Sequence, residues 1–446
     1  MMARKRIVVL GGGESGYGSA YLAKKQGYEV FLSDKGKLKE KYRSLLEEAG
    51  IPFEEGKHTP ELILSADEII KSPGLPETAE IMRLVREKGV HVISEIEFAG
   101  RFTEAKCLCV TGSNGKTTVT SLIYEMLLEA GYNVGLGGNI GMSFAYQVAT
   151  EKHDWYVLEL SSFQLDDMYE FRAHISLLTN ITPDHLDRYD YDLSKYAASK
   201  FRVTQNQDRS DYFVYNMDDP QTAFYLENHD MCHVTEVGVT AKSRTGNFLD
   251  QETEVFRFED KGVDIDLSKR LCAGLHNAYN FIQASAAALL AGVPAETVRH
   301  CVDTFGGIEH RMEHAGTVNG VTYINDSKAT NVDAAWYALE SMKTPVVWIA
   351  GGTDKGNDYS QLYGVVGNVH TLVCMGLDNS KLERAFTGRI KNIVSSGSFA
   401  EAMAEVQKYA EKGDTVLLSP ACASFDLFSN YEERGEMFKD FVKSIK

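Results

Sequence analysis

Residues 111–118, with the sequence TGSNGKTT, combine two glycines with a lysine and several hydroxyl side chains. Such a loop binds phosphate when it joins a strand to a helix, because glycine lets backbone N–H groups face an anion and the helix adds its positive N-terminal end. Lys116 can reach the terminal phosphates of a nucleotide, and the hydroxyl of Thr117 can bind a magnesium ion. A complete Walker loop has another glycine at position 110, where this chain has Val110. The alternative is an ordinary strand-to-helix turn that ends in lysine.

The residues around this loop predict the two elements that it requires. Residues 106–110 form a short apolar run that is typical of a buried strand. After the loop, apolar residues recur at helical spacing as far as Ala130, and Gly131 follows where a helix should end. The order of strand, glycine loop and helix favours a phosphate site over an accidental turn.

Two further side chains that could bind a metal ion follow predicted strands. Glu159 ends the apolar run 155–158, and His185 follows the run 174–180. In an open parallel sheet, ligands bind beyond the carboxyl ends of the strands, so both residues should lie near the phosphate loop. They are reasonable ligands for magnesium or for substrate. The alternatives are a helix-capping or surface carboxylate for Glu159 and a structural role for His185.

The N-terminal segment predicts a βαβ unit with its own glycine turn. The apolar run 7–10 precedes a G-x-G-x-x-G pattern in residues 11–16, and a helix should extend to about Gln26. A second strand, 29–32, leads to Asp34, where a dinucleotide-binding fold has its acidic residue. Taken alone, this pattern indicates NAD. Such turns also bind other nucleotides or serve only close packing.

Composition limits the class of protein. A chain of 446 residues with 43% hydrophobic and 24% charged residues should form two to four soluble domains. The net charge of −17 argues against a nucleic-acid partner. The seven cysteines are scattered without zinc-site spacing, and Cys107 and Cys109 are expected to pack in a core. No signal segment and no apolar run of about 18 residues is present, so a cytoplasmic protein without a membrane span is expected.

The rest of the chain continues the α/β pattern. Residues 231–275 suggest short antiparallel strands, a long helix should end near Gly292, and the glycine pair 306–307 resembles a hinge. Four later apolar runs predict strands, at residues 321–324, 346–349, 371–374 and 415–418. Three of these runs lead into polar loops, at residues 325–331, 351–355 and 419–426.

Seven segments carry motifs that identify a family, at residues 112–118, 138–141, 159–165, 180–188, 276–280, 310–311 and 326–331. Together they resemble the Mur ligase family, in the family's order and over nearly the whole chain. The resemblance implies an α/β fold of three domains. These would be a Rossmann-like domain at 1–104 that binds a UDP-sugar, a P-loop ATPase-like domain at 105–308 with appended short β-strands, and a Rossmann-like domain at 309–446 that binds an amino acid.

Within the family, residues 351–355, 419–426 and 430–435 are similar to the members that add D-glutamate. The resemblance implies an ATP-dependent ligase that joins D-glutamate to UDP-N-acetylmuramoyl-L-alanine in cytoplasmic peptidoglycan precursor synthesis. ATP would convert the L-alanine carboxylate to an acyl phosphate, which the D-glutamate amine would attack. The partners would be these small molecules alone, and a monomer is expected.

The family's ATP and metal residues map onto matching positions here. The ATP contacts implied are Gly112, Asn114, Gly115, Lys116, Thr117, Thr118, Asn277, Asn280, Arg311 and Asp326. Two Mg²⁺ ions would be held by Thr117, Glu159, His185 and Lys200. The family carries a carbamate on the lysine that matches Lys200, which without the resemblance is simply a helix-surface lysine. The residues expected to act in catalysis are Lys116, His185, Lys200 and Lys328.

The resemblance also implies that the ligand of the first domain is a UDP-sugar and not NAD. The contacts implied there are Ser15, Asp34, Ser72, Gly74 and, from the central domain, Asn139. D-Glutamate would be bound by His185, Thr330, Lys355, Ser424, Phe425 and Tyr431. The chain departs from the family in a glycine-richer first turn and in Tyr431, where phenylalanine is common.

Two other functions remain open at the level of sequence. One is an ATP-dependent ligase with a different acceptor, such as a relative of folylpolyglutamate synthase, although the UDP-type first domain argues against it. The other is a nucleotide-binding regulator or an NAD oxidoreductase, for which the first domain is the only support.

Overall fold

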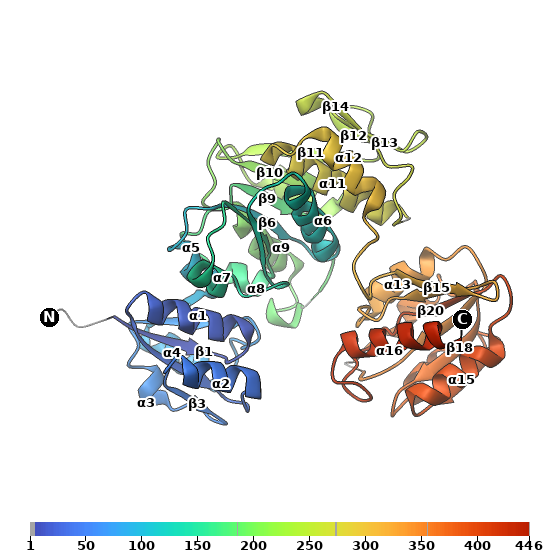
Figure 1. Cartoon of the computed structure of the whole chain (residues 1–446), viewed down its shortest axis with the longest axis horizontal. Helices are drawn as coiled ribbons and strands as arrows, with labels where there is room; N and C mark the ends of the chain where they lie inside the picture. The colour runs from blue at the N-terminus through green and yellow to red at the C-terminus, as the bar shows by residue number, and fades with distance from the viewer. Residues whose placement is uncertain (1–4, 185, 273, 355, 446) are drawn as a thin grey trace. The chain divides into compact units, whose positions relative to one another are not determined.

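The computed structural model describes residues 5–184, 186–272, 274–354 and 356–445. The chain forms two compact units, Met1–Arg270 with Leu275–Thr304, and Leu271–Gly274 with Phe305–Lys446. Two sheets belong to the first unit and one to the second (Figure 1). Among the described residues, no helix has both the length and the hydrophobicity that crossing a membrane requires.

The first sheet is parallel, with the strand order β3-β2-β1-β4-β5. Its strands are β1 (Arg6–Leu10), β2 (Glu29–Asp34), β3 (Phe53–Glu55), β4 (Glu68–Lys71) and β5 (His91–Ser94). The helices between and after them are α1 (Glu14–Lys25), α2 (Glu40–Glu48), α3 (Pro60–Ile63), α4 (Glu80–Lys88) and α5 (Glu95–Gly100). This is the strand order of doubly wound nucleotide-binding folds, and it confirms the predicted βαβ unit.

The second sheet has nine strands in the order β14-β13-β12-β11-β10-β9-β6-β8-β7. Its strands are β6 (Lys106–Thr111), β7 (Val134–Gly138), β8 (Trp155–Glu159), β9 (Ile175–Leu178), β10 (Tyr212–Asn216), β11 (Thr235–Thr240), β12 (Asn247–Asp250), β13 (Val255–Phe258) and β14 (Val263–Asp266). Its helices are α6 (Lys116–Glu129), α7 (Phe144–Thr150), α8 (Ser162–Asp166), α9 (Leu193–Phe201), α10 (Pro220–Asn228), α11 (Leu275–Ala291) and α12 (Ala295–Thr304). The predicted strand, loop and helix around residues 111–118 are present as β6 and α6.

The strands of residues 231–275 differ in part from the prediction. The pairs β12–β13 and β13–β14 are antiparallel, as expected. However, β11 pairs in parallel with β10, and β12 pairs in parallel with β11. Alternation of apolar and polar residues reports which face of a strand is buried and carries no information on strand direction, so the parallel extension was not predictable from it.

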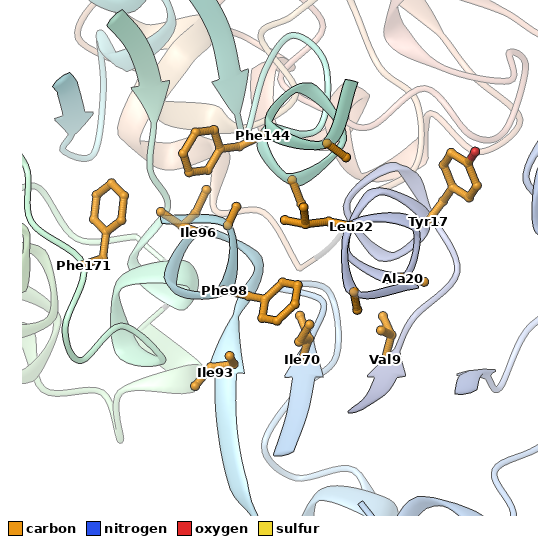
Figure 2. Packing of buried hydrophobic residues seen from close by; sticks show 14 of the residues in the cluster. Val9, Tyr17, Ala20, Leu22, Ile70, Ile93, Ile96, Phe98, Phe144 and Phe171 are labelled. Carbon is orange, nitrogen blue, oxygen red and sulfur yellow. The ribbon is translucent and has the colours of Figure 1, made fainter. Parts of the chain in front are cut away.

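The first two sheets share one hydrophobic core. In Figure 2, Val9 of β1, Ile70 of β4 and Leu22 of α1 lie in the same cluster as Phe144 and Phe171 of the central domain. Helix α1 packs against α7, and Cys107 and Cys109 are buried in this core, as the sequence predicted. The two domains of the first unit are therefore joined by continuous apolar packing.

The third sheet has the order β15-β16-β20-β17-β18-β19, in which only β15 runs antiparallel to its neighbour. Its strands are β15 (Glu313–Val318), β16 (Val321–Asn325), β17 (Val346–Ala350), β18 (Val369–Met375), β19 (Asn392–Ser396) and β20 (Thr415–Leu418). The helices are α13 (Val332–Glu340), α14 (Ser380–Phe386), α15 (Phe399–Tyr409) and α16 (Tyr431–Ser444). The four strands predicted for this part of the chain are confirmed as β16, β17, β18 and β20.

Candidate active site

The glycine loop after β6 adopts a conformation that glycine favours. Gly112 has φ 141° and Gly115 has φ 83°. A Cβ atom on Gly112 would lie 1.9 Å from Thr179 Oγ1, and one on Gly115 would lie 2.3 Å from Asn280 Oδ1. Both glycines are therefore required by backbone conformation and by close neighbours.

The segment that follows β9 holds this loop in place. The backbone N–H groups of Ser113 and Asn114 donate to the backbone oxygen and to Oδ1 of Asn180, at 2.9 and 3.0 Å. Ser113 Oγ also exchanges two hydrogen bonds of 2.9 Å with the backbone of Thr182. The loop is thus fixed by residues more than sixty positions away in sequence.

Lys116 begins α6 and folds back over the loop. Its Nζ donates to the carbonyl oxygens of Gly112 and Ser113, at 2.9 and 2.8 Å. An ammonium group in this position can exchange the carbonyl oxygens for the oxygens of a bound phosphate. Thr117 and Thr118, in the first turn of α6, are both buried.

Glu159, at the end of β8, lies on the strand next to β6 and is 1% exposed. Asn139 Nδ2 donates to its Oε1 at 2.8 Å. Its Oε2 is buried and has no hydrogen-bond partner among the described residues. The alternatives of a surface or capping carboxylate are wrong, and a buried carboxylate oxygen without a donor is a position that a cation would satisfy.

Lys200 lies in α9 and is 1% exposed, so the alternative of a helix-surface lysine is wrong. Its Nζ lies 4.5 Å from the centre of the Tyr196 ring. Burial lowers the pKa of Lys200 well below its ordinary value, and the charge of Lys116 lowers it further. Asp184 opposes this shift. A neutral amine is the form of lysine that adds carbon dioxide to form a carbamate, so the site fits the expected modification.

A chain of polar contacts around Lys200 was missed by the sequence reasoning. Tyr196 OH is hydrogen-bonded to Ser113 Oγ of the glycine loop at 3.2 Å. Tyr189 OH donates to Asp166 Oδ2 at 2.9 Å, and burial raises the pKa of Asp166. The aspartate pair directly after the 159–165 motif was the sequence signal that could have drawn attention to Asp166.

The structure brings Asn277 and Asn280 to the glycine loop from the start of α11. Asn280 Nδ2 donates to Asn277 Oδ1 at 3.4 Å, and Asn280 lies against Gly115. These two predicted ATP contacts therefore lie beside the predicted phosphate site.

The first domain places its predicted ligand residues at the carboxyl ends of β1, β2 and β4. Asp34 accepts hydrogen bonds from the backbone N–H groups of Gly12 and Gly36, at 2.6 and 2.7 Å. Ser72 lies against Gly11, where an added Cβ would approach it to 2.6 Å. Ser15 lies in the first turn of α1, and Gly74 lies in the exposed loop after β4. The remaining predicted UDP-sugar contact, Asn139, lies in the central domain, where its side chain contacts Glu159.

The second unit holds Asp326 in a buried position after β16. Asp326 accepts hydrogen bonds from Ser419 Oγ at 2.8 Å and from the backbone N–H of Met312 at 3.2 Å. Burial raises its pKa to about 7, although the nearby Arg311 lowers it. The buried Arg434, which the sequence reasoning missed, donates from Nε to Ser327 Oγ at 2.9 Å and fixes the loop that follows Asp326.

The predicted amino-acid residues are only partly brought together. Lys328 Nζ lies 5.7 Å from the centre of the Tyr431 ring. Ser424 is buried, Phe425 is 69% exposed, and Thr330 follows Lys328 in the same loop. His185 and Lys355 lie outside the described residues, so their predicted roles are not addressed by the structure.

Three protein-family models match the chain in succession. They are the MurD N-terminal domain at residues 6–81, the Mur ligase middle domain at 110–288, and the Mur ligase glutamate ligase domain at 310–422. The model for the first domain is specific to a Mur ligase, which excludes the NAD interpretation of the first glycine turn.

Relatives of known name match the chain over almost its whole length. The UDP-N-acetylmuramoylalanine–D-glutamate ligase of Christiangramia forsetii is 49% identical over 99% of this chain and 100% of its own. The corresponding ligase of Bacteroides fragilis is 50% identical with the same coverage. A solved UDP-N-acetylmuramate–alanine ligase from Thermotoga maritima shares the fold, with a TM-score of 0.64 and 17% identity over the full length of both chains.

The sheets and the glycine loop define a P-loop nucleotide-binding protein with three α/β domains. The relatives narrow this class to ATP-dependent ligases. The chain belongs to the Mur ligase family, among the UDP-N-acetylmuramoylalanine–D-glutamate ligases.

Proposed function

We propose that this chain joins D-glutamate to UDP-N-acetylmuramoyl-L-alanine with cleavage of ATP, in the synthesis of peptidoglycan precursors. The observation that carries the proposal is the 49–50% identity, over 99% of the chain, to ligases named for this reaction. The glycine loop with Lys116, the buried carboxylate of Glu159 and the buried amine of Lys200 support it.

The reaction has two steps. The L-alanine carboxylate of the UDP-sugar attacks the γ-phosphorus of ATP, which forms an acyl phosphate and releases ADP. The neutral amine of D-glutamate then attacks the acyl carbon and the C–N bond forms. The nitrogen loses one proton to solvent, and inorganic phosphate leaves with the electrons of the C–O bond that breaks. Phosphoryl transfer of this kind depends mainly on positioning and on neutralisation of charge.

ATP is proposed to contact the glycine loop and the polar residues that the family motifs mark. The backbone of 112–118 and the ammonium of Lys116 would hold the phosphates. Asn277 and Asn280 would lie toward the adenine, and Arg311 and Asp326 would contact ATP from the C-terminal domain. Lys328 would lie near the negative charge that develops on the transferred phosphoryl group.

Magnesium is proposed as the metal cofactor, with two ions. When bound, the ions neutralise phosphate charge and orient the phosphate oxygens. Thr117, Glu159, His185 and a carbamate on Lys200 would hold them. The unpartnered, buried Oε2 of Glu159 and the oxygen-rich donor set fit Mg²⁺.

The substrate contacts and domain limits stay predictions. Ser15, Asp34, Ser72, Gly74 and Asn139 are proposed for the UDP-sugar. His185, Thr330, Lys355, Ser424, Phe425 and Tyr431 are proposed for D-glutamate. The proposed limits are 1–104, 105–308 and 309–446, in a monomer that acts in the cytoplasm on small molecules alone.

The proposal is tested by phosphate release from ATP in the presence of UDP-N-acetylmuramoyl-L-alanine, Mg²⁺ and a panel of amino acids. We expect release with D-glutamate and little with L-alanine or neutral amino acids, because unfilled polar contacts can reduce use of an analogue by ~10⁴. Efficient ligation of L-lysine or diaminopimelate to UDP-N-acetylmuramoyl-L-alanyl-D-glutamate, with none of D-glutamate, would contradict the assignment and leave the fold intact.

A further inference from the structure

A buried ion pair joins the first domain to the central domain. Lys71 Nζ lies 2.8 Å from Asp167 Oδ2, as an ion pair whose atoms are not aligned for a hydrogen bond, and the two side chains are only 5% and 4% exposed. Arg86 reaches the other oxygen, Asp167 Oδ1, at 3.2 Å, and Glu77 gives Lys71 a second partner. Two side chains from the first domain thus converge on one carboxylate of the central domain.

Lys71 is the last residue of β4 and directly precedes the loop 72–74. This loop is proposed above to contact the UDP-sugar. Arg188 of the central domain also contacts this loop, and its Nη1 donates to the Pro73 carbonyl oxygen at 3.3 Å. The guanidinium of Arg188 in turn lies 4.0 Å from the centre of the Phe163 ring. The central domain therefore contacts the loop itself and the residue that anchors it.

Asp167 directly follows Asp166, which belongs to the polar contacts around Lys200. From Asp166 the contacts continue through Tyr189 OH at 2.9 Å. The Tyr189 ring lies 5.3 Å from that of Tyr196, whose hydroxyl contacts the glycine loop. These side-chain contacts, together with the chain bonds from Lys71 to Ser72 and from Asp166 to Asp167, thus link the loop 72–74 with the phosphate loop.

Stability alone does not account for this pair. The apolar core shown in Figure 2 already joins the two domains. A buried ion pair is weak evidence for added stability, because the loss of hydration of both charges offsets most of their attraction. What it adds is specificity in how the two domains meet, since each buried charge needs its partner from the other domain.

We propose that Lys71 and Asp167 are positioning residues that fix the loop 72–74 relative to the phosphate loop, so that the substrate carboxylate meets the γ-phosphate of ATP. This inference rests on the proposed function. The pair lies outside the proposed substrate contacts, so its effect should fall on turnover and spare recognition of the uridine diphosphate.

The test compares Lys71→Met, Asp167→Asn and the double variant with the full-length wild type. We expect kcat at saturating substrates to fall roughly tenfold to a hundredfold, since small misplacements of reacting groups cost this much. The Kd for UDP alone and the KM for ATP should change less than about twofold, because those contacts are left in place. The double variant should be no slower than the slower single variant, because both changes break the same contact.

The matched control is Asp211→Asn, which breaks the pair of Arg172 Nε with Asp211 Oδ2, at 2.8 Å, within the central domain. Asp211 is 2% exposed, so the control removes a comparably buried carboxylate. It should lower Tm and leave kcat within about twofold of wild type. If a single variant does not fold, the double variant, which leaves no lone charge between Lys71 and Asp167, carries the test.

Unchanged kcat in folded variants, or a fall no larger than that of Asp211→Asn, would overturn the inference. Weakened binding of UDP in parallel with kcat would also overturn it, because the pair would then shape the loop itself. A wild-type chain that does not ligate D-glutamate would overturn the proposed function and this inference together. An active wild type with unaffected variants would overturn this inference alone.

Discussion

At the scale of single residues, Lys116 is held by contacts with its own loop. It lies over the glycine loop through two carbonyl contacts, and the UDP-sugar is proposed to bind in another domain. We expect Lys116→Ala to reduce ligation to below about a tenth of wild type, a loss above ~1.4 kcal/mol in transition-state stabilisation. UDP binding, measured by calorimetry, should be nearly unchanged.

The control for this prediction is Lys106→Ala, because Lys106 is exposed and lies on β6, the strand that leads into the loop. It should retain wild-type activity. If Lys116→Ala kept more than a tenth of wild-type activity, the proposed role of Lys116 in catalysis would be contradicted, and the glycine loop would be an ordinary turn.

Lys200 is buried and burial lowers its pKa, and a carbamate would convert it into a metal ligand. We expect Lys200→Ala to lose activity by about a hundredfold, as loss of groups that support a metal typically does. Formate or acetate should restore part of the activity by supplying the missing carboxylate. The measurement is phosphate release with increasing concentrations of these acids.

Lys195→Ala is the matched control, since Lys195 lies on the same helix and its side chain is 53% exposed. It should retain activity and show no response to short acids. A mild phenotype for Lys200→Ala, or activity that short acids do not raise, would argue against a carbamate.

At the scale of elements, the glycine loop joins β6 to α6 only because its backbone can adopt positive φ. Gly112→Ala would combine φ 141° with a Cβ atom 1.9 Å from Thr179 Oγ1. We expect a loss of about 1–3 kcal/mol in the free energy of unfolding and at least a tenfold loss of ATP affinity. Denaturant unfolding and nucleotide titration provide the two measurements.

Gly364→Ala serves as the comparison, because Gly364 has no positive φ and a Cβ atom added to it would meet no other atom within 4 Å. It should leave both quantities unchanged within error. Equal stability of Gly112→Ala and Gly364→Ala would show that the loop relaxes to accept a side chain.

The elements themselves were largely predictable, because hydrophobic periodicity and glycine positions act locally. The strand before residues 111–118 and the helix after them were found in this way, as was the end of α11 before Gly292, which has φ 97°. The direction of β11 was not, because pairing partners are chosen by tertiary packing. Motif matching proposed the candidate site residues, whereas local reasoning alone left Glu159 and Lys200 open to surface roles.

The contacts that support the site were not predictable from one sequence. Asn180 anchors Asn114 across 66 positions, and Lys71 meets Asp167 across 96 positions, counted from the residue numbers. Only the fold brings such residues together, and neither pair has a local signature. Arg434 is a further example: it lies in a recognised motif, but its hydrogen bond to Ser327 could not be predicted from that motif.

At the scale of the first unit, a buried carboxylate lies between the two domains. Glu95, at the start of α5, accepts hydrogen bonds from Ser143 Oγ and from the backbone N–H of Ala145 at 3.1 Å. It is 3% exposed, and its Oε2 has no hydrogen-bond partner among the described residues. Burial raises the pKa of Glu95 to about 7, and the charge of Glu14 adds to this rise.

This raised pKa predicts how the junction responds to pH. The folded state favours protonated Glu95, so the stabilisation is complete below the ordinary pKa of about 4.5 and is lost as the pH rises through about 7. The loss should reach at most roughly 3 kcal/mol by pH 8.

Since other groups also titrate, the quantity to measure is the difference in unfolding free energy between wild type and Glu95→Gln at pH 5, 6, 7 and 8. Glutamine stays neutral, so the variant should gain on wild type from pH 5 to about pH 7, and the difference should level off toward pH 8. Glu87→Gln, an exposed change in the first domain, should show a constant difference. A difference for Glu95→Gln that does not vary with pH would mean that Glu95 stays ionised in the folded protein.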